Sequence, residues 1–150
     1  MPIAAQYPGA MTGTVEQIAI AAEESELPGT VDQVDVSGAG IAGDRYADKG
    51  DITLIEAEAL EAFTAETGLE LSHQESRRQV LTRGIRLNDL VGKRFRVGEV
   101  EVVGRELCEP CSHLQSLTRP GVLKGMVHRA GLNADIVTPG RIAVGDQVHG

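Results

Sequence analysis

Apolar and polar side chains alternate along several short segments of the chain, the pattern of strands that bury one face. The pattern predicts strands at residues Thr14–Ala21 and Thr30–Val36. It is clearest around Gly98, where residues 94–97 and 99–103 alternate apolar and charged side chains and predict a hairpin.

Fewer segments of the chain predict helices than predict strands. Residues Glu56–Thr67 carry an apolar stripe with helical periodicity, and Gly68 follows as a C-terminal cap. Residues Gly121–Arg129 also predict a helix, with Pro120 at its first turn. Short strands with glycine turns continue beyond Pro139. Together these elements predict a mainly β fold, a small mixed or antiparallel barrel with a few short helices.

Length and composition narrow the class of protein. The 150 residues, 41% of them hydrophobic, predict a flexible leader at residues 1–12 and one domain at residues 13–150. Tryptophan is absent and aromatic residues make up 3%, so stacking platforms for nucleic acid are scarce. No apolar run approaches the roughly 20 residues of a membrane span. Two close cysteines without an export signal predict a cytoplasmic protein with free thiols.

Charge is distributed unevenly along the chain. Residues 1–70 carry two basic and fourteen acidic side chains, a net charge of −12, whereas residues 71–150 carry twelve basic and eight acidic ones, a net charge of +4. The acidic first half argues against DNA binding. The basic half holds both cysteines, which suits either a site for a small anion or a solvated face.

Two segments contain arginines that could bind an anion. In residues 37–46, a glycine-rich loop ends in Asp44-Arg45, either an exposed ion pair or the rim of a pocket in which Arg45 reaches an anion. Residues 76–87 contain Arg77, Arg78, Arg83 and Arg86, either solvated charges or a phosphate grip. Because side chains alternate along a strand, Arg77 and Arg78 cannot both face one pocket.

The segment Cys108-Glu-Pro-Cys111 follows an expected strand and precedes a helical turn. Four interpretations remain open. A structural zinc site would need two more ligands, from histidines at unsuitable spacings. A redox pair is expected in a βαβ context, whereas this chain shows hairpins. Two incidental cysteines would behave as small hydrophobes. A single thiolate near arginines would act as a nucleophile or as a ligand of a soft metal.

Several motifs, taken in order, resemble a stand-alone MOSC domain, the module named for the C-terminal part of molybdenum cofactor sulfurases. The similarity runs from about Gly13 to Val148 and is carried by Gly40-Ile-Ala-Gly43-Asp44-Arg45-Tyr46, Arg77-Arg78-Gln79-Val80 with Thr82-Arg83-Gly84, Leu90-Val-Gly92 with Phe95-Arg-Val-Gly98, and Cys108-Glu-Pro-Cys111 with Leu114. The tail from Gly131 to Asp146 also fits.

The resemblance implies a mainly β barrel in which the family's shared cysteine matches Cys111. That cysteine is expected to carry sulfur or to bind molybdenum in a pyranopterin cofactor. The leading hypothesis is a reductase of N-hydroxylated compounds with Cys111 as catalytic residue and molybdenum ligand. One or more of Arg45, Arg78, Arg83 and His128 would bind the cofactor's phosphate or pterin edge.

Two alternatives stay open beside this hypothesis. One is a sulfur carrier that uses a Cys111 persulfide, with Cys108 resolving it. The other is a non-catalytic binding barrel for an anionic metabolite. The expected partners are a small-molecule substrate and a separate electron donor or a cysteine desulfurase. The sulfurases' pyridoxal-phosphate domain has no room in this chain, so we do not expect that cofactor.

Overall fold

The computed structural model describes residues 12–150. The leader predicted at residues 1–12 therefore lies outside the described residues, except for Thr12, which begins strand β1.

Seven of the described strands close into a ring. They follow the order β11, β7, β8, β9, β5, β6, β1, and pairing of β1 with β11 closes it. Their bounds are β1 Thr12–Ile20, β5 Asp51–Glu56, β6 Val80–Arg83, β7 Arg94–Val97, β8 Val100–Leu107, β9 Leu132–Thr138 and β11 Gln147–His149. The pair β5–β6 is parallel, and the other pairs of the ring are antiparallel. The prediction of a small mixed barrel is confirmed.

Shorter strands extend this framework. Strand β2 (Gly29–Val31) pairs with the end of β1, while β3 (Gln33–Ser37), β4 (Gly40–Ile41) and β10 (Gly140–Ala143) form a three-stranded sheet. The single strand predicted at Thr30–Val36 is therefore wrong, because the chain bends at Asp32 and its two halves enter different sheets.

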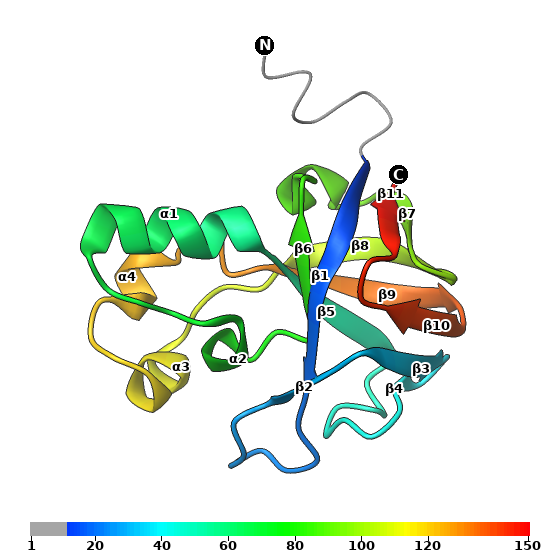
Figure 1. The fold of residues 1–150 in the computed structure, drawn as a ribbon, viewed down its shortest axis with the longest axis horizontal. Helices are drawn as coiled ribbons and strands as arrows, with labels where there is room; N and C mark the ends of the chain where they lie inside the picture. The colour runs from blue at the N-terminus through cyan, green and yellow to red at the C-terminus, as the bar shows by residue number, and fades with distance from the viewer. Residues whose placement is uncertain (1–11) are drawn as a thin grey trace, which may run out of the picture.

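The helices gather on one side of the barrel, on the left in Figure 1. They are α1 (Ala57–Thr67), α2 (His73–Ser76), α3 (Ser112–Leu117) and α4 (Val122–Gly125), and a short 3-10 helix, η2 (Leu87–Leu90), also occurs. Helix α1 ends at Gly68 in the left-handed conformation, as predicted. The helix predicted at Gly121–Arg129 shrinks to α4, because Met126 at its C-terminus already departs from helical geometry (φ −105°, ψ 7°), and His128, with a φ of 64°, could not continue it.

Two apolar clusters hold the layers together. One fills the barrel. The other packs the helices against it, around Phe63 of α1, Leu71 before α2, Leu114 of α3 and Val122 of α4. The chain segment that carries the cysteines crosses between these two layers, from the end of β8 to the start of α3.

Candidate functional site

The cysteine segment is a strand-to-helix connection, as its sequence predicted. The backbone N–H of Cys108 donates to the carbonyl of Gly131 at 2.8 Å, which fixes the segment where β8 ends. Cys111 is the N-cap of α3, and its thiol accepts from the N–H of Leu114 at 3.5 Å. The sulfur of Cys111 is therefore placed at the start of a helix.

The two thiols have opposite environments. Both are free, but Cys108 is buried and Cys111 is exposed. Cys108 is only 7% exposed. Burial raises its pKa to about 11, so it stays protonated at neutral pH. Cys111 is thus the thiol of this segment that a reagent, a ligand or a partner can reach.

A pocket of about 460 Å³ opens beside this segment and is lined by Cys108 and Glu109. Its other walls come from the loop that contains Tyr46 and Lys49, from β5, from the end of β8 and from β9. Cys111 follows Glu109 by two residues along the chain. The pocket therefore lies next to the segment that carries the exposed thiol, and Cys111 itself is not among its lining residues.

Positive and negative side chains balance in the lining of this pocket. Three are basic (Lys49, Arg78, Arg105) and three are acidic (Asp51, Glu106, Glu109). Arg105 is engaged by carboxylates on three sides, at 2.7 Å from Asp51, 2.9 Å from Glu106 and 3.0 Å from Asp135. Burial raises the pKa of Asp51 in spite of this pairing. Arg105 is therefore already neutralised by the protein.

Arg78 is the pocket arginine best placed for an anion. Its Nε donates to the carbonyl of Ala130 at 2.7 Å, which holds the guanidinium in position. Among the described residues, none accepts a hydrogen bond from its two Nη groups. Neighbouring Arg77 points elsewhere and donates to the carbonyls of Glu24 and Glu26. The prediction that Arg77 and Arg78 face different ways is confirmed.

Arg45 is committed to its own loop. Its side chain is 7% exposed, lies 3.3 Å from Asp44 and 3.4 Å from Glu24, and stacks 4.4 Å from the ring centre of Tyr46. Asp44 is buried, not an exposed partner, and accepts from the backbone N–H groups of Ala21 and Tyr46. Arg45 thus supports Tyr46, and it is Tyr46 that lines the pocket.

Arg83 and His128 are also held by other side chains. Arg83 lies 2.6 Å from Glu16 and 2.6 Å from Glu61, and it is not among the residues that line the pocket. Glu109 accepts from the backbone N–H of His128 at 2.7 Å and lies 2.6 Å from its Nδ1. His128 therefore anchors the cysteine segment. Of the four predicted cofactor-binding residues, only Arg78 lines the pocket.

Sequence reasoning missed several residues of this pocket, including Lys49, Asp51, Arg105 and Asn133. Asn133 belongs to β9, which pairs with both β5 and β8 and so brings distant segments together. Asp51 lies at the start of β5, in register with Asp135 of β9. The only local signal was the charged cluster around Gly50, at the entrance to an apolar strand.

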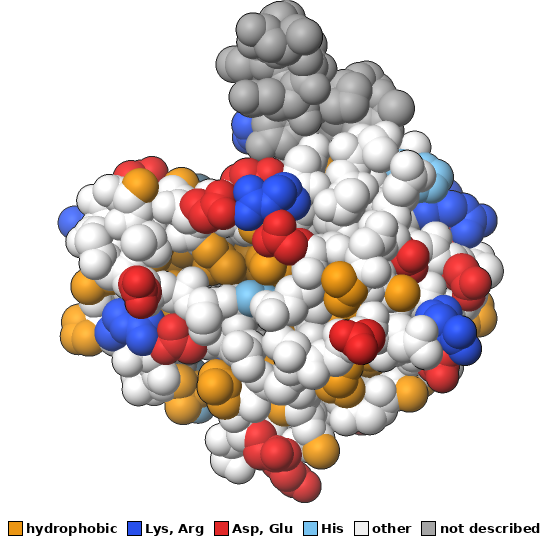
Figure 2. Space-filling model, viewed as in Figure 1, with side chains coloured by type: hydrophobic (Ala, Val, Ile, Leu, Met, Phe, Trp, Pro, Cys, Tyr) orange, Lys and Arg blue, Asp and Glu red, His pale blue; other side chains and the backbone are white. Residues whose placement is uncertain are grey.

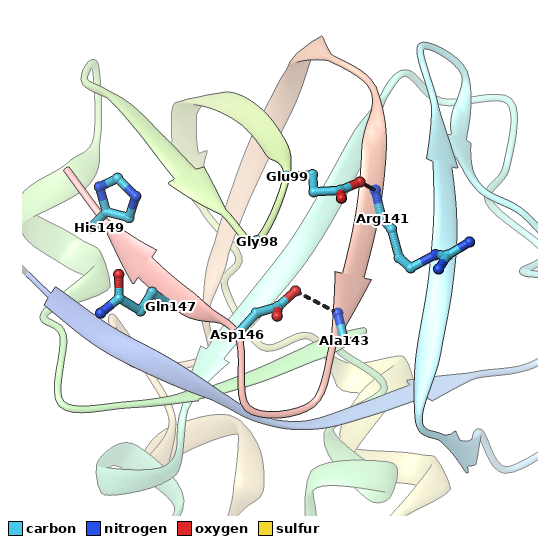
Figure 3. Close-up of a pocket in the computed structure, with 7 residues that line it drawn as sticks. All are labelled: Gly98, Glu99, Arg141, Ala143, Asp146, Gln147 and His149. Atoms are coloured by element: carbon cyan, nitrogen blue, oxygen red, sulfur yellow. Dashed lines mark hydrogen bonds between the residues drawn. The ribbon is translucent and has the colours of Figure 1, made fainter.

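A second cavity, of about 340 Å³, is lined by residues from the turns at Gly98 and Asp146 (Figure 3). Its carboxylates bind backbone: Glu99 accepts from the N–H of Arg141 at 2.9 Å, and Asp146 accepts from the N–H of Ala143 at 2.8 Å. None of the predicted site residues lines it. The first contact joins the turn between β7 and β8 to β10, and the second closes the turn between β10 and β11.

Within residues 12–150, no group of three or more His, Cys, Asp or Glu side chains is arranged to hold a metal ion. In the same part of the chain, no helix is both long and apolar enough to span a membrane.

Comparison with known proteins identifies the family to which this barrel belongs. The sequence model of the MOSC domain matches residues 43–149, and the chain belongs to the MOSC domain family. No curated protein matches it significantly.

Solved structures share its fold. The YuaD protein from Bacillus subtilis superposes with a TM-score of 0.82 at 17% identity, over 93% of this chain and 95% of that one. YiiM from Geobacillus stearothermophilus gives a TM-score of 0.71 at 14% identity, over 92% of this chain and 75% of that one. YiiM from Escherichia coli gives a TM-score of 0.68 at 16% identity, over 91% of this chain and 68% of that one.

Proposed function

We propose that this MOSC domain binds a pyranopterin molybdenum cofactor in the pocket beside residues 108–111, with the Cys111 thiolate as a ligand of molybdenum. The observation that carries the proposal is the exposed thiol at the start of α3, next to a pocket in which Arg78 keeps both Nη groups unengaged. A thiolate suits a soft metal, and a guanidinium fork suits a phosphate.

The ligands that the protein offers at this pocket suit a metal whose cofactor supplies most of its coordination. The described residues offer no three-ligand group, so a bare metal ion would find one thiolate and little else. A cofactor that supplies sulfur ligands from its pterin needs only one more from the protein. Arg78 would bind its phosphate, and Cys111 would complete the coordination.

When bound, such a cofactor supplies two-electron chemistry with transfer of an oxygen atom. The protein's own residues would bind the substrate and orient it. Tyr46, stacked on Arg45, and Asn133 form walls against which a small N-hydroxylated substrate would be held. Electrons for the reduction of this substrate would come from a separate protein.

The test is the molybdenum and pterin content of protein purified from a host that makes the cofactor. Cys111→Ser should lose most of its molybdenum. Arg78→Met should weaken cofactor binding by about ten- to a hundredfold, the loss of one charge-assisted hydrogen-bonding group. Arg83→Met is the matched control and should retain the cofactor, since Arg83 is held by Glu16 and Glu61. Equal metal in wild type and Cys111→Ser would refute the ligand role.

A sulfur carrier is the second candidate, because an exposed Cys111 thiol could equally accept a persulfide from a cysteine desulfurase. Cys108 is poorly suited to resolve it, since a thiol with a pKa of about 11 is protonated and buried. A sulfur adduct on Cys111 in the intact mass, without bound molybdenum, would favour the carrier. A binding barrel for an anionic metabolite instead predicts that Cys111→Ser leaves ligand affinity unchanged.

A further inference from the structure

Another surface feature lies in the helical layer, away from the pocket beside residues 108–111. A groove of about 560 Å³ runs between α1 and the segment that enters α2. Leu60 and Ala65 of α1 and Leu71 before α2 give it apolar walls. Figure 2 shows hydrophobic side chains uncovered between these helices, below a cluster of acidic and basic side chains. A volume of this size can take a small number of aliphatic side chains.

The rim of this groove is acidic. Three of its eight lining residues are glutamates (Glu61, Glu70, Glu75), and none is lysine or arginine. Glu61 and Glu75 each pair with an arginine from outside the lining, Arg83 and Arg119. No described residue donates a hydrogen bond to the exposed carboxylate of Glu70, which leaves it open to an incoming cation.

The groove is connected to the helix that carries the exposed thiol. Its floor residues Leu60 and Leu71 belong to the same apolar cluster as Leu114 of α3. Arg119, just beyond α3, lies 2.5 Å from Glu75 and also donates to the backbone carbonyl of Glu70. A molecule bound in the groove would therefore rest against the layer that positions Cys111.

We propose that this groove docks a basic segment of a partner protein, one that inserts aliphatic side chains between α1 and α2 and brings lysine or arginine to Glu70. Charge complementarity selects this occupant, because an acidic rim favours a basic partner and repels an acidic one. A second copy of the chain is disfavoured for the same reason, since its net charge is −8. The inference is independent of the proposed cofactor.

The probe is a fluorescently labelled amphipathic peptide of leucine and lysine, and its binding is measured by anisotropy. Ala65→Trp fills the groove and Glu70→Lys reverses its unpaired charge; each should weaken binding by about tenfold or more. Ala22→Trp and Glu23→Lys make the same changes at exposed positions outside the groove and should change binding less than about twofold. Circular dichroism checks that all four variants fold.

Four results would overturn the proposal. The first is equal loss in Glu70→Lys and Glu23→Lys, which would reduce the effect to the net charge of the protein. The second is unchanged binding in Ala65→Trp. The third is self-association of the wild type that Ala65→Trp abolishes, because the occupant would then be a second copy of this chain. A leucine and glutamate peptide that binds as tightly as the lysine one would also contradict it.

Discussion

Cys108 and Cys111 belong to one short turn, yet the fold gives them different chemistry. Cys108 is buried in the lining of the pocket, and burial raises its pKa to about 11. Cys111 caps α3 and is exposed. Because the thiolate is the reactive form, the burial and raised pKa of Cys108 and the exposure of Cys111 leave Cys111 as the residue that reacts or binds.

Alkylation kinetics test this difference. We expect iodoacetamide at neutral pH to modify Cys111 at least about tenfold faster than Cys108, since burial shields the Cys108 thiol from the reagent and raises its pKa to about 11. Peptide mapping by mass spectrometry measures both rates in one sample, with urea-unfolded protein as the control in which the rates converge. Equal rates in the folded protein would contradict the assigned environments.

His73 makes stability depend on pH. It is 4% exposed, its Nδ1 lies 2.9 Å from Gln17 Oε1, and burial lowers its pKa from 6.5 to about 4. Between these two values the unfolded chain binds a proton that the folded chain does not, so stability falls as pH falls. Between pH 7 and pH 5 the loss should be about 2 kcal/mol.

Urea unfolding at these two pH values measures this loss. His73→Gln should remove the contribution and flatten the dependence by that amount. His113→Gln, which removes an exposed histidine, should leave it close to wild type. A His73→Gln protein with the same pH dependence as wild type would show that His73 titrates normally in the folded state.

At the scale of elements, β8 decides where the cysteine segment begins. Its pairing with β9 shifts register between Gly104 and Glu106, and Gly104 lies against the segment after η2. A Cβ on Gly104 would stand 2.1 Å from the carbonyl oxygen of Leu90, which is backbone and cannot rotate away. The glycine therefore allows η2 and β8 to pack closely just before the site.

Gly104→Ala should destabilise the protein by about 2 kcal/mol or more, because the clash forces a shift of backbone. The free energy of unfolding in urea is the measurement. Gly29→Ala in β2 is the control and should be nearly neutral, since no atom lies within 4 Å of the added Cβ. Similar values for the two variants would mean that β8 and η2 are free to move apart.

The hairpins, helix α1 and the position of the cysteine could be predicted from sequence because each depends on local spacing. The alternation around Gly98 and the apolar stripe before Gly68 are patterns within a few residues. Strand β9 could not be predicted in this way, because its residues owe their conformation to pairing with β5 and β8. Missing β9 also hid Asn133, the residue that this strand contributes to the pocket.

The same limit applies to the arginines. Residue type showed that Arg45, Arg78 and Arg83 could bind an anion. It did not show which of them would instead pair with carboxylates of the protein itself. Arg83 meets Glu16 and Glu61, from segments 67 and 22 residues earlier. Arg78 donates through Nε to a backbone carbonyl, and none of the described residues accepts a hydrogen bond from its Nη groups. The difference arises from tertiary contacts alone.

At the scale of the whole molecule, ring closure and the helical layer place the two proposed surfaces. Pairing of β1 with β11 joins the first and last described strands, and the helices cover one side of the ring (Figure 1). Residues 108–111 cross from the barrel to that layer beside the proposed cofactor pocket, while the acidic groove lies within the layer. The proposed cofactor and the proposed protein partner would thus occupy separate surfaces, which share no lining residue.

X-ray absorption at the molybdenum edge tests the central claim most directly, on cofactor-loaded wild type and on Cys111→Ser loaded by incubation with excess cofactor. Coordination of molybdenum by the Cys111 sulfur predicts one sulfur neighbour fewer in the variant, with Cys108→Ser indistinguishable from wild type. The same number of sulfur neighbours in wild type and Cys111→Ser would contradict it.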